Sequence, residues 1–161
     1  MFNVVIMQGV SGAGKSTVAR QLIVGRPFAR IVSADDYHTR EGVYKCDPTK
    51  HGEAHNQCMR MFIEAAQDKM HLIVVDNVNA RELNIAPYMA VAEAYGYDAT
   101  ILRVVCDPNV AHARNIHGVP QENIVRWSAD IFGRSLPPWW RVKAYNADLA
   151  TVESTMGEVL A

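Results

Sequence analysis

The sequence lacks the features that mark membrane-spanning, secreted and metal-cluster proteins. No apolar run approaches the length of a membrane span, about 20 residues. The N-terminus has no basic region before its first apolar stretch, so we expect no signal peptide. The three cysteines, Cys46, Cys58 and Cys106, lie far apart and fit neither a CxxC metal site nor a disulfide framework. We therefore expect a reducing, cytoplasmic location and no membrane partner.

An excess of positive charge is also missing. Lysine and arginine number 16 against 17 acidic residues, which gives a net charge of −1. A protein that wraps nucleic acid tightly is usually basic, so any polynucleotide would be held by a local patch or by brief contacts. With 161 residues, of which 49% are hydrophobic, we expect one globular domain over residues 1–161.

The strongest motif is the stretch at residues 9–17, GVSGAGKST, which fits the phosphate-binding pattern G-x-x-x-x-G-K-[ST]. An apolar strand pattern precedes it and a helical pattern follows it, which is the context that this motif requires. The glycines let backbone N–H groups curl around phosphate oxygens, and the helix N-terminus adds further donors. Lys15 is expected to reach the β- and γ-phosphates of ATP, and the Ser16 hydroxyl to hold Mg²⁺. The residues expected to bind the nucleotide are Gly9, Ser11, Gly12, Ala13, Gly14, Lys15, Ser16 and Thr17.

Strand and helix patterns alternate along the whole chain. We expect strands at 2–8, 29–33, 71–76, 98–105 and 142–146. We expect helices at 15–25, 53–69, 81–96, 108–117, 120–132 and 151–160, with a polar loop at 39–50. This alternation predicts an α/β fold of three layers, the P-loop NTPase fold, with a five-stranded parallel sheet and helices on both faces. The predicted strand order is 2-3-1-4-5, and a helical lid is expected after the fourth strand.

Acidic residues stand where the second and third strands end, at the sheet edge where ligands bind in such folds. Asp35 is the candidate to accept the proton of an acceptor hydroxyl, and Asp36 competes for this role. On an extended chain the two carboxylates would point opposite ways, so only one would face the cleft. The alternative is that they cap the following turn. Asp76 resembles the acid that holds Mg²⁺ at the end of a Walker B strand, or else forms a turn with Asn77.

Three further features are open to two interpretations each. Arg114 would place its guanidinium on the transferring phosphoryl if its helix belongs to a lid, or would be a surface arginine. Trp139 and Trp140 would stack a base or anchor a chain turn. The basic loop around Arg40 would hold an anionic acceptor or would simply be solvated.

Together these motifs resemble the small P-loop kinases grouped with the 5′-hydroxyl polynucleotide kinases. The likeness covers roughly residues 3–140, and the sequence resembles the kinase-like domain of Nedd4-binding protein 2 and its relatives more closely still than the phage polynucleotide kinase of this group. The stretches that carry it are 9–17, 33–37, 42–48, 53–55, 76–79 and 113–120.

The resemblance implies that Asp35 is the general base and that Lys15, Ser16 and Arg114 bind and activate ATP–Mg²⁺. The sequence departs from the family at His38, where the phage 5′-hydroxyl polynucleotide kinase of this group has an arginine that contacts the acceptor phosphate; Arg40 is the possible substitute. A second lid arginine of that kinase falls near His117.

The sequence thus predicts an ATP-dependent kinase that phosphorylates a hydroxyl, foremost the 5′-hydroxyl of a nucleic acid end. The residues expected to contact the acceptor are Asp36, His38, Arg40 and Asn77. Two alternatives stay open. The acceptor would be a nucleoside, sugar or other metabolite, or the chain would be a nucleotide-binding adaptor that transfers nothing.

Overall fold

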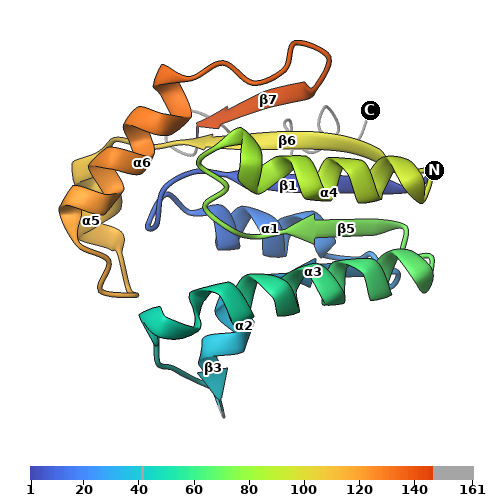
Figure 1. The fold of residues 1–161 in the computed structure, drawn as a ribbon, viewed down its shortest axis with the longest axis horizontal. Coiled ribbons are helices and arrows are strands. Elements are labelled where there is room, and N and C mark those ends of the chain that lie inside the picture. The colour runs from blue at the N-terminus through green and yellow to red at the C-terminus, as the bar shows by residue number, and fades with distance from the viewer. Residues whose placement is uncertain (41, 147–161) are drawn as a thin grey trace.

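The protein is built around one parallel sheet, seen in a computed structural model that describes residues 1–40 and 42–146 (Figure 1). Its strands are β1 (Asn3–Gln8), β2 (Ala29–Val32), β5 (Leu72–Val75), β6 (Asp98–Val105) and β7 (Arg141–Asn146). Their spatial order is β2-β5-β1-β6-β7, and every pair is parallel. Counted along the chain this is order 2-3-1-4-5, so the predicted topology is confirmed. The helix expected at 151–160 lies outside the described residues.

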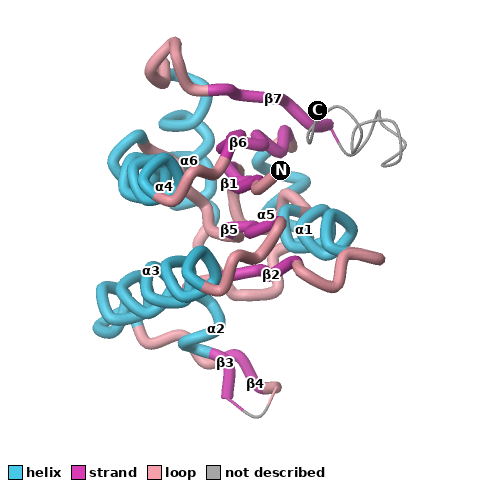
Figure 2. Tube along the Cα trace, turned by 90° about the vertical axis from the view of Figure 1, so that its right-hand side faces the viewer, coloured by secondary structure: helices cyan, strands magenta, loops and turns pink. Residues whose placement is uncertain are grey.

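Helices cover both faces of the sheet and complete the three layers (Figure 2). Helices α3 (His51–Gln67) and α4 (Glu82–Ala94) lie on one face, and α1 (Lys15–Ile23) lies on the other. Strand β1 is buried on both sides: Val5 and Met7 pack on the α1 side, while Val4 and Ile6 pack on the α3 and α4 side. Because central parallel strands meet helices on both faces, β1 and β5 are almost continuously apolar.

Two helices follow β6 at the carboxyl edge of the sheet, where a helical lid was expected. They are α5 (Pro108–Arg114) and α6 (Gln121–Gly133), and the arrows of β5, β6 and β7 point toward the side of Figure 1 where α5 lies. Helix α5 ends three residues earlier than the sequence pattern suggests. The Asn115 side chain explains this end, because its amide donates to the Val119 carbonyl at 2.8 Å and accepts from the His117 N–H at 3.1 Å.

The segment expected as a polar loop at 39–50 has regular structure instead. After the one-turn helix α2 (Asp35–His38), strands β3 (Thr39–Arg40) and β4 (Val43–Tyr44) form an antiparallel hairpin. A 3₁₀ turn (Pro48–Lys50) then leads into α3. Within the described parts of the chain, no helix has the length and apolar character needed to cross a membrane.

Candidate active site

The glycine-rich loop joins the carboxyl end of β1 to α1 and has the backbone of a phosphate cradle. Gly12 and Gly14 adopt φ values of +83° and +94°, which side-chain-bearing residues rarely tolerate. Gly14 is the N-cap of α1, and its carbonyl accepts from the N–H groups of Thr17 and Val18, both at 3.1 Å. Left-handed glycines in such a turn aim successive N–H groups at one point, so the loop is built to hold an anion.

Gly12 also brings the loop against the lid. A Cβ at this position would stand 1.9 Å from the carbonyl oxygen of Ala111 in α5. Only a residue without a side chain allows the loop and α5 to approach this closely. The cradle and the lid helix are therefore one packed unit.

Lys15 lies at the centre of the site, with 8% of its surface exposed. Its Nζ donates to the Val10 carbonyl at 2.8 Å, a bond within the loop itself. Burial lowers the pKa of this ammonium, and the charges of Asp76 and Asp35 oppose that effect. Lys15 is therefore within electrostatic reach of both acids, which come from the ends of two other strands.

Asp76 follows β5 and is held by its backbone. Its N–H donates to the Val32 carbonyl at 2.9 Å, and its own carbonyl accepts from the Ser33 hydroxyl at 2.8 Å. Its carboxylate and the exposed Ser16 hydroxyl at the start of α1 are the oxygen ligands on offer for Mg²⁺. Across residues 1–40 and 42–146, no three His, Cys, Asp or Glu side chains are grouped to hold a metal ion. This donor set fits Mg²⁺, which usually completes its shell with water and nucleotide phosphate.

Asp35 and Asp36 lie in a helical turn and not on an extended chain. The prediction that their carboxylates point opposite ways assumed an extended chain, and that assumption was wrong. They begin the helical turn of α2, where the Ser33 hydroxyl accepts from the Asp35 N–H at 3.2 Å. Burial raises the pKa of Asp36, and the neighbouring charges of Asp35 and Asp76 add to this effect. Asp35, and not Asp36, is among the charges that act on Lys15. The electrostatics therefore favour Asp35 over Asp36 as the acid on the side of the cradle.

Two side chains from distant elements meet at the Asp35 carboxylate. The Tyr44 hydroxyl, on β4, lies 3.5 Å from Oδ1, and His117 Nε2, between α5 and α6, lies 3.8 Å from Oδ2. Sequence reasoning missed Tyr44 altogether, and it treated His117 only as a departure from the family. The available signal was the two-residue connection between residues 40 and 43, which ends in glycine and is typical of a hairpin. Gly42 has a φ of +78°, as such a turn requires.

Asn77 turns its side chain inward, with 8% of its surface exposed. Its Oδ1 accepts from the Ala34 N–H at 2.9 Å, directly before α2. Its Nδ2 lies 3.4 Å from Cys58 Sγ and 3.5 Å from the Tyr88 hydroxyl. Asn77 therefore ties the turn that carries Asp35 to helices α3 and α4. These contacts position the turn that carries Asp35. The role of Asn77 in acceptor binding stays a prediction.

The same loop holds the start of the phosphate cradle. Asn79 Nδ2 donates to the Met7 carbonyl at 2.7 Å, and the Gly9 N–H donates to the Val78 carbonyl at 3.1 Å. Gln8 Nε2 returns a bond to the Asn79 carbonyl at 3.0 Å. The phosphate cradle, the loop after β5 and the turn before α2 are thus linked by hydrogen bonds at the carboxyl edge of the sheet.

The other predicted site residues are placed as follows. His38 is buried beneath the hairpin, where its ring meets Tyr44 edge-on at 6.1 Å between centroids. Arg114 is the last residue of α5 and is exposed. The backbone of Arg40 belongs to β3, while its side chain lies outside what the structure describes.

Trp139 and Trp140 do not join the site. They precede β7, whose first residue pairs with Thr100 near the start of β6, so they lie at the amino end of the sheet. Trp140 packs on the core, and Trp139 is 79% exposed beside a hollow of ≈ 550 Å³. Their position fits a chain turn anchored to the core.

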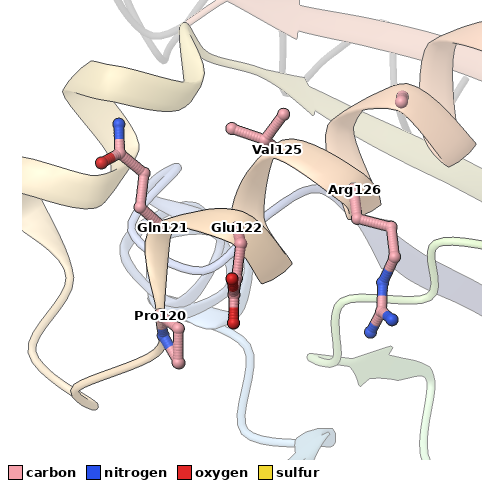
Figure 3. Close-up of a pocket in the computed structure, with 6 residues that line it drawn as sticks. Pro120, Gln121, Glu122, Val125 and Arg126 are labelled. Carbon is pink, nitrogen blue, oxygen red and sulfur yellow. The ribbon is translucent and has the colours of Figure 1, made fainter.

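A second hollow, of ≈ 690 Å³, runs along the first half of α6 (Figure 3). It is lined by Pro120, Gln121, Glu122, Val125, Arg126 and Ala129. None of the predicted site residues lines it, so it is separate from the cluster around Lys15 and Asp35.

Comparison with known proteins identifies relatives of this chain. A family model described as "AAA domain" matches residues 4–122. The human (Homo sapiens) NEDD4-binding protein 2 is 34% identical over 126 residues, a match that covers 76% of this chain and 7% of that protein. The chain thus corresponds to a small part of this relative. The likeness to this protein, inferred from the motifs, is confirmed.

Solved structures share the fold at lower identity. The APS kinase CysC of Mycobacterium tuberculosis, in complex with AMPPNP and APS, has a TM-score of 0.63 at 15% identity and covers 99% of this chain and 95% of its own. A chain of the Pnkp1/Rnl/Hen1 RNA repair complex has a TM-score of 0.66 at 17% identity, covering 81% of this chain and 44% of its own. The protein therefore belongs to the AAA-domain family that this model describes, and its fold is that of the P-loop kinases.

Proposed function

We propose that the protein transfers the γ-phosphoryl group of ATP to a hydroxyl, foremost the 5′-hydroxyl at the end of a polynucleotide. One observation carries the proposal: hydrogen bonds through Ser33 hold Asp35, which begins α2, beside Asp76 at the end of β5, and the Asp35 charge acts on buried Lys15 in the phosphate cradle. A nucleotide-binding switch needs only the phosphate cradle. A kinase also needs a base that accepts the proton of the acceptor hydroxyl, and a carboxylate near the cradle can fill this role.

The proposed step is a direct displacement at phosphorus. The acceptor oxygen bonds to the γ-phosphorus while the bond to the β,γ-bridging oxygen breaks, so ADP leaves. Asp35 takes the proton of the acceptor hydroxyl. Lys15 leaves the Val10 carbonyl and donates to the β- and γ-phosphate oxygens, and Arg114 neutralises charge on the transferring group.

The remaining nucleotide contacts come from the cradle. Backbone N–H groups between Gly9 and Thr17 donate to the phosphates, and Ser16 and Asp76 would hold Mg²⁺. The ion, when bound, neutralises charge on the β- and γ-phosphates. Asn77 holds the α2 turn, so that Asp35 keeps its position when the acceptor arrives.

The polynucleotide acceptor is supported by the similarity to the RNA repair complex chain and by the family motifs. Asp36, His38 and Arg40 are the proposed acceptor-side residues, together with Asn77. A small-molecule acceptor is the second candidate. It is favoured by the similarity to a kinase whose structure holds APS, and by a net charge of −1.

An acceptor panel with γ-labelled ATP tests the proposal. The purified protein is offered 5′-hydroxyl DNA, 5′-hydroxyl RNA, nucleosides and sugars, each with Lys15→Ala protein as the matched control. We expect label on an oligonucleotide end with the native protein and none with the variant. Label found only on small molecules would exclude the polynucleotide acceptor, and no transfer to any acceptor would favour the adaptor.

The cysteines fit the proposed cytoplasmic setting. Cys46 and Cys58 are free thiols, the first exposed and the second buried. Thiols persist in a reducing compartment.

A further inference from the structure

We propose that Tyr44 and His117 form a stacking platform for the terminal base of the acceptor; this rests on the proposed function. Their rings lie against each other with centroids 4.2 Å apart and an interplanar angle of 55°. One ring comes from the β3–β4 hairpin and the other from the α5–α6 connection. The contact joins the two segments that flank the acceptor side of Asp35.

The platform lies directly beside the reacting end of the site. Tyr44 and His117 contact different oxygens of the Asp35 carboxylate, at 3.5 Å and 3.8 Å. A hydroxyl that delivers its proton to Asp35 would therefore lie beside these rings. In a nucleic acid end, the base belongs to the same nucleotide as the 5′-hydroxyl, so it lies within a few ångströms of this point.

Both rings are held in place from behind. Tyr44 packs edge-on against buried His38, whose carbonyl accepts from the Lys45 N–H at 2.9 Å. The N–H of His117 donates to Asn115 Oδ1 at 3.1 Å, which fixes the turn that carries the imidazole. Rings that are already ordered lose little side-chain entropy when a base stacks on them.

One polar atom of the platform is unsatisfied. His117 Nδ1 is buried and has no hydrogen-bond partner among the described residues. A buried polar atom without a partner costs free energy, and a shift of the imidazole on binding would let a polar group of the acceptor satisfy it. Most of the recognition would still come from stacking, which every base offers and which therefore tolerates any sequence.

The platform explains how a chain without a basic excess would select a polynucleotide end. Phosphate contacts alone would require several lysines or arginines. Stacking of one base instead provides affinity at the end that reacts. A sugar or another acceptor without a base would forgo this contact.

The test compares two 5′-hydroxyl oligonucleotides that differ only at the first residue. One carries a normal base, and the other carries an abasic tetrahydrofuran residue. With the native protein we expect the abasic acceptor to lose about 5- to 150-fold in kcat/KM, mainly through KM. Tyr44→Leu should remove this preference, whereas Tyr44→Phe should keep it because the ring remains.

The controls separate stacking from other roles. Trp139→Ala removes an exposed aromatic ring at the opposite end of the sheet and should leave the preference intact. If Tyr44→Leu does not fold, as judged by thermal unfolding, His117→Leu removes the other ring and gives the same comparison.

Two results would overturn the platform while leaving the proposed kinase intact. One is equal kcat/KM for both oligonucleotides with the native protein. The other is a Tyr44→Leu protein whose kcat/KM falls by the same factor for both oligonucleotides, because Tyr44 would then act only through Asp35. Transfer to neither oligonucleotide would refute the polynucleotide function and the platform together.

Discussion

The close approach of Gly12 to α5 allows a prediction whose size follows from the structure. In Gly12→Ala, the new Cβ would stand 1.9 Å from the Ala111 carbonyl oxygen and 2.8 Å from its carbon. Real Cβ atoms essentially never come within 3.0 Å of another atom, so the two backbones must separate by about 1 Å. The atoms concerned belong to the main chain, which cannot rotate away as a side chain would.

Two costs add up in Gly12→Ala. A non-glycine residue in the left-handed region costs about 1–2 kcal/mol. Overpacking of a well-packed contact costs about 1–3 kcal/mol. The free energy of unfolding should therefore fall by about 2–5 kcal/mol, which lowers Tm by about 4–20 °C in a chain of this size. Nucleotide binding should weaken as well, because the cradle can no longer pack against the lid.

Two other glycines provide matched controls. Gly25 has a φ of +69° and Gly14 a φ of +94°, and a Cβ on either would meet no atom within 4 Å. Gly25→Ala should carry the backbone cost alone and leave nucleotide affinity unchanged. Gly14→Ala should cost similar stability but weaken nucleotide binding, because it strains the left-handed turn that aims the N–H groups of the cradle.

Thermal unfolding and calorimetric titration with ATP measure both effects. We expect the Tm values to fall in the order native, then Gly25→Ala, then Gly12→Ala. A Gly12→Ala protein as stable as Gly25→Ala would refute the reasoning, since the contact with α5 would then carry no cost.

Three further predictions concern Lys15 and Asn77 in the site and Asp130 on α6. Lys15→Ala should reduce phosphoryl transfer below detection in a γ-labelled ATP assay, and near-normal turnover would contradict its role in the cradle. Asn77→Ala should lower the free energy of unfolding by about 1–3 kcal/mol in urea titrations, because the buried N–H before α2 loses its acceptor. The hydrogen bond from Arg81, and next that from Arg134, lowers the pKa of Asp130 below its ordinary value of 3.8. The stabilisation from Asp130 is therefore present above about pH 4 and is lost as the pH falls through the lowered pKa, so Asp130→Asn should destabilise the protein at pH 7 and progressively less as the pH falls below 4.

The sheet and the cradle were predictable because each depends on local sequence. Continuous apolar runs between loop signals identify buried parallel strands, and their order follows from the P-loop topology. The motif at 9–17 specifies the shape of its loop, because Gly12 and Gly14 stand at the two positions where the backbone has a positive φ. The convergence of the strand ends follows from the parallel arrangement alone.

The acceptor side was harder to predict because its contacts join distant segments. A one-turn helix such as α2 is too short to produce a helical period, so the acids at 35 and 36 were assigned to extended chain. The direction of Asn77 depends on Cys58 and Tyr88, which lie on two different helices. The meeting of Tyr44 with His117 depends on how the lid packs, which no local pattern encodes.

The rate of transfer by Asp35→Asn protein, measured beside its affinity for ATP, tests the central claim most directly. The substitution removes the proposed general base while keeping the shape of the side chain. We predict that kcat falls by about 10²–10⁴-fold while ATP binds as before. A rate close to that of the native protein, or a large loss in Asp36→Asn instead, would contradict the assignment of Asp35 as the base that faces the phosphate cradle.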